Sequence, residues 1–310
     1  MWRQWALAAG LAASCLTAPA GARSSPDRGA TIPLYVAGEI ASLNVPETSD
    51  TIAETGEVMI FNVSEPTLEL FRPTRGKANG TAVIVVPGGG FVGLGYEAGG
   101  AAIARRLVRH GVTAFVLKYR TIRSPNTAMH MPEVHMREME AVVARARTGS
   151  PREMPHFAGE PNAAADGARA MTIVRRRAAE WGIDPHRVGM IGFSSGAYLA
   201  ADLAIGPMAT RPDFVALIYG GLRTPVPANA PPAFIAGAAD DEYQTNDPLL
   251  LFSAWRQAGA PAEMHVYERG GHGFSLAPQG TTSDYWIDEL IWWMRSHRFV
   301  GGGAEDRRAR

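Results

Sequence analysis

Cysteine is almost missing from this sequence. The 310 residues contain a single cysteine, Cys15, and it lies within the first 22 residues. Once that segment is removed, the remaining chain can form no disulfide bond and offers no thiol nucleophile. The sequence therefore excludes a disulfide framework and thiol catalysis.

An excess of charge of either sign is also missing. Lys plus Arg and Asp plus Glu number 30 each, so the net charge is zero. With no broad basic field to attract nucleic acid or anionic lipid, we expect no nucleic-acid partner. The composition, 46% hydrophobic and 19% charged, is that of a chain that buries a core.

The N-terminal apolar run is too short to anchor the chain stably in a membrane. Arg3 precedes this run, Trp5–Leu16, and small residues follow at positions 20 to 22. This order is typical of a secretory signal peptide, so we expect residues 1–22 to be one. The protein is then exported, periplasmic or secreted, with no transmembrane anchor after cleavage. Lipid attachment at Cys15 is the alternative, although the residues before it match a bacterial lipobox only loosely.

Strand and helix patterns alternate along most of the chain. Residues 23–55 predict an irregular lead-in, and residues 301–310 predict a disordered tail. Residues 57–73 predict a strand or hairpin pair. Between residues 82 and 299, apolar runs typical of buried strands alternate with helical patterns. This alternation predicts one α/β domain over residues 56–300, with a mostly parallel central sheet and helices on both faces.

Residues 121–165 interrupt this alternation. They contain five prolines, three histidines and one helical stretch, EVHMREMEAVVARAR. Connections this long are uncommon in compact domains unless they are functional. We interpret the segment as a lid or a wall of the substrate site, and a surface decoration is the alternative. Because His130, His135 and His156 lack a metal-ligand spacing and a carboxylate partner, we expect no metal there.

The stretch GFSSG places Ser194 at the centre of a G-x-S-x-G motif. It follows an apolar strand pattern and opens an alanine-rich helix pattern, the context that a nucleophile elbow requires. In such a tight turn the central hydroxyl lies above the sheet edge, beside the free N–H groups of the helix N-terminus. Ser194 is therefore the candidate nucleophile, and the backbone N–H of Ser195 is a candidate oxyanion donor. For the motif taken alone, a glycine-serine helix cap is the alternative.

A candidate base and acid follow in the chain order expected after an elbow serine. His272 lies in a Gly-Gly-His-Gly loop, and Asp240 and Asp241 follow the preceding strand pattern. Both loops come just after strands, where α/β sheets place their sites. His272 would take the proton of Ser194, and an aspartate would orient the imidazole.

Two neighbouring aspartates compete for the role of the acid. Asp240 lies three residues after Gly237, and Tyr243 occupies the place where such acid loops commonly carry an apolar residue. On this spacing we favour Asp240. Asp241 is then a solvated neighbour or a loop cap, and Glu242 is a third candidate.

Three glycines after the first buried strand, in VVPGGGFVG, supply further backbone N–H groups. Glycine lets an N–H group approach a developing charge because no Cβ stands in the way. A nucleotide-phosphate loop is the rival interpretation. It fails because no Gly-Lys-Ser/Thr follows and the nearby glycines form no dinucleotide fingerprint, so we expect no cofactor.

These stretches together resemble the α/β-hydrolase esterase/lipase family. More narrowly, they are similar to bacterial exported acetylxylan esterase-like proteins, which are often loosely called xylanases. The resemblance rests on NGTAVIVVPGGGFVGL, GVTAFVLKYR, RVGMIGFSSGAYLAADLA, PPAFIAGAADDEY and MHVYERGGHGF, which span most of residues 79–275. It implies an α/β-hydrolase fold, to which residues 121–165 add an inserted lid-like segment, and a metal-independent serine esterase mechanism.

The resemblance also assigns residues. It implies Ser194, Asp240 and His272 as the catalytic triad, and the backbone N–H groups of Gly89, Gly90 and Ser195 as oxyanion donors.

Three features depart from the family pattern, and the first is the length of the segment 121–165, which implies a different substrate pocket. Pro87 stands where the lipases and esterases commonly carry the histidine of His-Gly-Gly-Gly, and SSGAYLA replaces the more usual SAGGHLA. Tyr198 then fills space near the site or carries a hydroxyl toward it. We take Phe91, Tyr198 and Tyr243 as candidate substrate contacts.

The expected function is therefore an exported carboxylic-ester hydrolase that works through an acyl-enzyme on a small-molecule or oligosaccharide ester. The resemblance favours short acyl groups, such as the acetyl groups of xylan. The alternatives are a serine peptidase or lipase-like hydrolase with another acyl preference, and a non-catalytic binding protein of the same fold. Because no paired carboxylates are framed as a glycosidase needs them, we do not expect endo-xylanase activity.

Overall fold

The computed structural model describes residues 28–52, 56–74, 76–125, 131–148, 152–244 and 246–301. The predicted signal peptide with Cys15, His130 and the predicted tail from residue 302 onward lie outside the described residues. Those predictions therefore stay predictions. No helix within the described ranges is long and apolar enough to cross a membrane.

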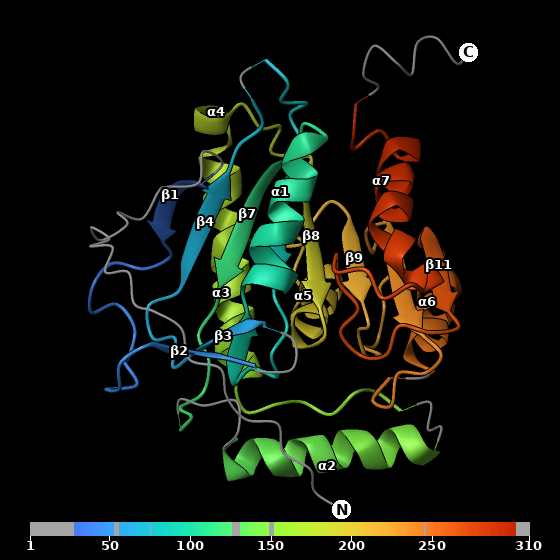
Figure 1. The fold of residues 1–310 in the computed structure, drawn as a ribbon. Helices are drawn as coiled ribbons and strands as arrows, with labels where there is room; N and C mark the ends of the chain where they lie inside the picture. The colour runs from blue at the N-terminus through green and yellow to red at the C-terminus, as the bar shows by residue number, and fades with distance from the viewer. Residues whose placement is uncertain are drawn as a thin grey trace, which may run out of the picture.

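An eight-stranded sheet forms the centre of the molecule (Figure 1). Its strand order is β1-β4-β7-β5-β8-β9-β10-β11. The pairs from β7 to β11 are parallel, and β4 runs antiparallel to both β1 and β7. The strands are β1 Arg28–Pro33, β4 Thr67–Phe71, β5 Ala82–Val86, β7 Thr113–Lys118, β8 Val188–Phe193, β9 Val215–Ile218, β10 Ala233–Ala238 and β11 Ala262–Tyr267. The predicted α/β class with a mostly parallel sheet is confirmed.

Helices cover both faces of this sheet (Figure 1). One face carries α3 (Glu160–Arg176), α5 (Ser195–Ile205) and α6 (Asp247–Gln257), and the other carries α1 (Ala102–Arg109) and α7 (Trp286–Ser296). The short helix α4 (Ala178–Trp181) follows α3, the π-helical turn η1 (Glu97–Ala101) precedes α1, and the 3-10 turn η2 (Thr282–Tyr285) precedes α7.

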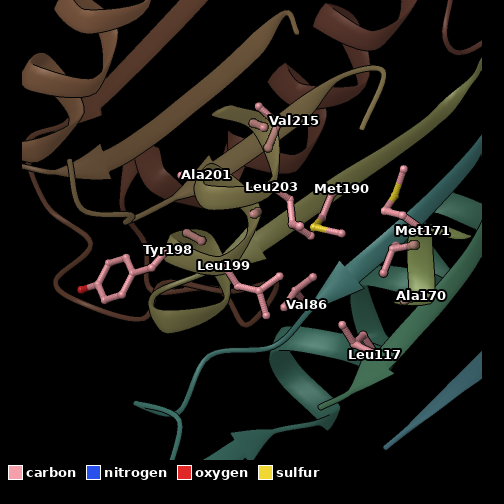
Figure 2. Close-up of a cluster of buried hydrophobic side chains, with 14 of the residues drawn as sticks. Val86, Leu117, Ala170, Met171, Met190, Tyr198, Leu199, Ala201, Leu203 and Val215 are labelled. Atoms are coloured by element: carbon pink, nitrogen blue, oxygen red, sulfur yellow. The ribbon is translucent and has the colours of Figure 1, made fainter. Parts of the chain in front are cut away.

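Two large buried clusters, one on each face of the sheet, form most of the core, and Met59, Phe61 and Val92 form a small third cluster. Alternate residues of β5 divide between the two large clusters: Ile84 and Val86 join the first cluster, whereas Val83 and Val85 join the second. Figure 2 shows part of the first cluster, where Val86 lies among side chains of α3 and α5. This division explains why β5 is a continuous apolar run, since a strand buried on both faces needs apolar residues at every position.

The helix α2 (Glu133–Thr148) lies apart from both helical layers. It crosses the molecule at the edge where the parallel strands end (Figure 1). This edge is where α/β sheets place their sites, so α2 is positioned to form a wall of one.

The N-terminal part differs from its prediction. The lead-in contains two strands, β1 and β2 (Thr48–Thr51), and the expected pair β3 (Val58–Phe61) and β4 is split between sheets. β3 pairs with β2 and with β6 (Gly93–Gly95) in a separate three-stranded sheet. The alternating pattern did not identify these partners because alternation reports which face is buried, not which strand lies alongside. β2 carried no apolar alternation at all, because its sequence TSDT is polar.

Candidate active site

Ser194 occupies the sharp turn between β8 and α5. Its backbone has φ 52° and ψ −120°, a strained conformation for a residue with a side chain. The chain passes so close to itself here that a Cβ on Gly192 would lie 2.1 Å from the carbonyl oxygen of Gly196. A Cβ on Gly196 would lie 2.2 Å from the carbonyl oxygen of Val86. Both flanking glycines are therefore required by the geometry of the turn.

Three side chains form a continuous hydrogen-bonded chain above this turn. The Oγ of Ser194 lies 2.8 Å from Nε2 of His272, and Nδ1 of His272 lies 2.9 Å from Oδ2 of Asp241. Asp241 is buried, and its Oδ1 accepts the backbone N–H groups of Tyr243 and Gln244. A carboxylate at Nδ1 keeps the proton on that nitrogen, which leaves Nε2 free to accept the proton of Ser194.

The structure corrects the choice between the two aspartates. Asp240, which the sequence favoured, is exposed, and its Oδ1 accepts the N–H groups of Gly270 at 3.0 Å and Gly271 at 2.7 Å. It therefore holds the backbone of the histidine loop. The spacing from Gly237 located the loop correctly but not the direction of each side chain. β10 ends at Ala238, and a turn closed by the N–H of Asp241 onto that residue's carbonyl directs the second aspartate at the imidazole.

The glycine loop after β5, residues 88–90, lies against Ser194. A Cβ on Gly88 would lie 2.8 Å from the carbonyl oxygen of Phe193 and 3.1 Å from Cβ of Ser194. Within the described part of the chain, the N–H groups of Gly89 and Ser195 donate to no protein acceptor. Both predicted donors are thus open. The prediction for Gly90 is wrong, because its N–H donates to Oγ of Ser195 at 2.9 Å.

A cavity of about 570 Å³ opens over Ser194 and His272. The glycine loop forms part of its wall. The other lining side chains come mainly from three segments: Ile52, Glu57 and Met59; His135 and Met139; and Ser275, Ala277, Pro278 and Gln279. A larger groove of about 800 Å³ runs along β1 and α3, but its lining residues include no serine or histidine. The hydrogen-bonded side chains Ser194 and His272 therefore open into the smaller cavity.

The predicted substrate contacts divide into one that lines this cavity and two that do not. Tyr243 lines it and meets the His272 ring edge-on, with ring centroids 5.1 Å apart. Phe91 is fully buried, and Tyr198 is buried with its hydroxyl bonded to the side-chain amide of Gln244. Neither of these two residues lines the cavity, and of the two roles considered for Tyr198 the structure shows the filling of space in the core. Phe91 takes a positive φ of 61°, and its ring packs in the core against Tyr119.

Sequence reasoning missed Tyr219. It follows β9, and its ring lies edge-on to His272 with centroids 5.0 Å apart. Burial raises the pKa of the Tyr219 hydroxyl well above its ordinary value, so this ring stays neutral. Together with Tyr243 it packs against the imidazole, and both rings are steeply inclined to it. Its only sequence signal was its place directly after a buried strand.

His135 is the second residue that was missed, because it was weighed only as a metal ligand. It lies on α2, is 8% exposed, and lines the cavity with Ser194. A Cβ on Gly90 would lie 2.4 Å from its Cε1, so the imidazole packs directly on the glycine loop. Burial lowers its pKa, which keeps the ring neutral near pH 7. The segment 121–165 therefore contributes a wall to the cavity through α2.

The fold and this hydrogen-bonded site define an α/β hydrolase. The pattern of the dienelactone hydrolase family matches residues 70–292, and the chain belongs to that family. The comparisons with known proteins support an esterase-like hydrolase.

Two curated relatives and one solved structure extend the comparison. The chain is 24% identical over 283 residues to an acetylxylan esterase of Xylanibacter ruminicola, covering 79% of this chain and 52% of that protein. It is 24% identical over 237 residues to endo-1,4-beta-xylanase B of Butyrivibrio fibrisolvens, and the match covers 63% of this chain and 32% of that protein. The chain thus spans about half or less of these relatives. The crystal structure of an acetyl ester-xyloside bifunctional hydrolase from Caldicellulosiruptor lactoaceticus superimposes with a TM-score of 0.63 at 22% identity. The match covers 89% of this chain and 98% of that chain.

Proposed function

We propose that this protein is a serine carboxylic-ester hydrolase with Ser194, His272 and Asp241 as its triad. The observation that carries the proposal is the hydrogen-bonded chain from Ser194 through His272 to Asp241 at the floor of a cavity. The two open N–H groups of Gly89 and Ser195 beside the nucleophile support it, since a serine hydrolase needs donors for the oxyanion.

The mechanism follows from this geometry. Ser194 Oγ attacks the ester carbonyl carbon while Nε2 of His272 takes its proton, and the buried carboxylate of Asp241 stabilises the resulting imidazolium. The negative charge on the former carbonyl oxygen is held by the N–H groups of Gly89 and Ser195. The intermediate collapses when His272 returns the proton to the departing alcohol, which leaves an acyl-enzyme. Water, deprotonated by the same imidazole, then releases the acid.

The substrate we propose is a short acyl ester of a carbohydrate, with acetylated xylan as the first candidate. The acetylxylan esterase relative and the acetyl ester-xyloside hydrolase neighbour support this choice. The cavity offers polar groups that fit sugar hydroxyls, on Glu57, His135 and Gln279, beside the apolar side chains of Met59 and Phe193. Export through the N-terminal segment, which fits a polysaccharide substrate outside the cell, belongs to the same proposal.

The first test is hydrolysis of p-nitrophenyl esters from acetate to octanoate by the protein and by Ser194→Ala. We expect the variant to lose at least about a thousandfold in kcat, since the nucleophile is gone. Ser296→Ala is the matched control, because its hydroxyl bonds only to the carbonyl of Trp293 on α7. Full activity in Ser194→Ala would contradict the assignment of Ser194 as the nucleophile.

The acyl series and a polymer assay separate the remaining candidates. A steep preference for acetate, with acetate released from acetylated xylan, supports the carbohydrate deacetylase. A preference for octanoate points to a lipase-like enzyme, and cleavage of peptide substrates points to a peptidase. A chain that hydrolyses none of these and takes no label from an organophosphonate is a binding protein of the same fold.

A further inference from the structure

The glycine loop that carries one oxyanion donor is held locally through carbonyl groups: that of Gly89 accepts the N–H groups of Val92 and Gly93, and that of Gly88 accepts the N–H of Gly95. Its three successive glycines include two with positive φ, 135° at Gly89 and 63° at Gly90. Glycine loses more conformational freedom on ordering than any other residue. Pro87, at the start of the loop, has no N–H and no polar side-chain atom with which to anchor it. An oxyanion donor helps only when it is aimed before the reaction begins, so contacts that fix the two ends of the loop, at Pro87 and Gly90, matter as well.

Two hydroxyl groups provide those contacts. The N–H of Gly90 donates to Oγ of Ser195 at 2.9 Å. Oγ of Ser195 lies 3.3 Å from the hydroxyl of Tyr119, and that hydroxyl donates to the carbonyl of Pro87 at 2.9 Å. Because the Tyr119 hydroxyl donates its hydrogen bond to the carbonyl of Pro87, Ser195 is the donor in the hydrogen bond between the two hydroxyls. Every donor in the network is thus used once, and both ends of the glycine loop are bound.

Burial makes this network rigid. Ser195 is 1% exposed and Tyr119 is fully buried, so water does not compete for their hydroxyl groups. Burial also raises the pKa of the Tyr119 hydroxyl far above its ordinary value, and the group therefore stays protonated. A network with all its members satisfied in a low-dielectric interior holds its geometry well.

The network also connects the loop to the nucleophile. Ser195 follows Ser194 directly and opens α5, and its own backbone N–H is the other open donor beside the site. Its side chain therefore fixes the Gly89 donor relative to the same turn that presents Ser194. This arrangement gives the second serine of GFSSG a function of its own.

We infer that Ser195 and Tyr119 are positioning residues, whose hydroxyl groups hold the glycine loop so that Gly89 N–H faces the developing oxyanion. The inference rests on the proposed ester hydrolase. Neither hydroxyl touches the substrate, and both act through the loop.

The test compares Ser195→Ala and Tyr119→Phe with the native protein on p-nitrophenyl acetate. We expect kcat to fall about tenfold in each, less than the hundredfold or more that follows direct loss of an oxyanion donor, with KM changed less than twofold. Because both changes break one network, the double variant should lose no more than about threefold beyond either single one. Tyr267→Phe is the control, since it removes a buried hydroxyl that bonds to Glu289 outside the cavity.

Two further readouts separate positioning from general damage. A trifluoromethyl ketone, which forms an oxyanion adduct on Ser194, should bind more weakly to both variants in proportion to the loss of kcat/KM. Hydrogen exchange in the peptide that contains residues 87–95 should be faster in both variants, whether or not the ester reaction is measured. If both variants keep the kcat and the hydrogen-exchange rate of the native protein while Ser194→Ala is inactive, the positioning role is overturned and the proposed function is not. A native protein that hydrolyses no ester and takes no organophosphonate overturns the proposed function instead.

Discussion

At the scale of single residues, the adjacent carboxylates Asp240 and Asp241 have separate contacts and should respond differently to the same change. We expect Asp241→Asn to lower kcat by about 10³ to 10⁴, because an amide cannot hold the required imidazole tautomer or stabilise its charged form. Asp240→Asn should lower it less than tenfold, since the amide oxygen still accepts the N–H groups of Gly270 and Gly271. Steady-state hydrolysis of p-nitrophenyl acetate measures both, and a larger loss in Asp240→Asn contradicts the assignment.

The same two aspartates show how far residue-level prediction reaches. Ser194 and His272, which the structure brings into hydrogen-bond contact, could be predicted because glycines around each constrain the local backbone, and that information is carried within a few residues of sequence. The choice between Asp240 and Asp241 depends on the direction in which a turn leaves β10, and side-chain spacing does not encode it. His135 and Tyr219 lie on other elements and meet the site only through the tertiary fold, so no local pattern marked them.

At the scale of elements, α2 is fastened to the domain by a buried ion pair. Arg145, near its C-terminal end, bonds both oxygens of Asp247 at 2.7 Å, and the two side chains are 8% and 1% exposed. Asp247 opens α6 and also accepts the N–H of Leu222. The wall of the cavity is therefore anchored at a point far along the helix from His135.

Breaking this ion pair should destabilise the protein. We expect Arg145→Met to lower the free energy of unfolding by about 3 kcal/mol, because it leaves the buried carboxylate of Asp247 without its partner. Urea unfolding measures the loss. The control is Arg137→Met on the same helix, whose exposed pair with Glu133 should contribute less than about 1 kcal/mol. Equal losses in the two variants contradict the anchoring role.

At the scale of the whole molecule, a buried charge cluster joins three parts of the chain. Arg223 is fully buried. It donates a hydrogen bond to Glu160 at the start of α3 at 2.7 Å, and its Nε lies 3.1 Å from Asp202 on α5 in an ion pair. Burial, followed by the hydrogen bond with Glu160, raises the pKa of Asp202 to about 8. Burial alone would raise the pKa of Glu160. The hydrogen bond with Asp202 and the charge of Arg223 nevertheless hold the pKa of Glu160 below its ordinary value. The two carboxyl groups therefore share one proton at neutral pH.

This shared proton predicts a pH dependence of stability. The folded protein binds the Asp202 proton more tightly than the unfolded chain does, so its contribution is complete in acid and is lost as the pH rises to about 8. Asp202→Asn removes the titration. We expect the stability advantage of the native protein over this variant to shrink between pH 5.5 and pH 8.5, as followed by urea unfolding. An advantage that grows over this range contradicts the assignment. His156 and Glu153, which also face the cluster, are unchanged in both proteins.

At this scale the sequence predicted the central sheet well, because strands buried on both faces stand out as unbroken apolar runs, as in β5 and β8. It failed for the strands before residue 62. There β2 is polar and β3 joins a separate sheet, and pairing depends on contacts with β6 that lie more than 30 residues further along the chain.

The two doublets of the site, Ser194-Ser195 and Asp240-Asp241, have one property in common. In each pair, one side chain belongs to the hydrogen-bonded triad, and its neighbour binds the backbone of a loop that the triad depends on. A one-residue insertion or deletion just before either doublet would shift both side chains by one position, so that one would take its neighbour's place and the other would leave the site. The number of residues in these two turns is thus constrained more tightly than the type of residue at each position. Variation among related chains should accumulate in them as substitutions and not as gaps.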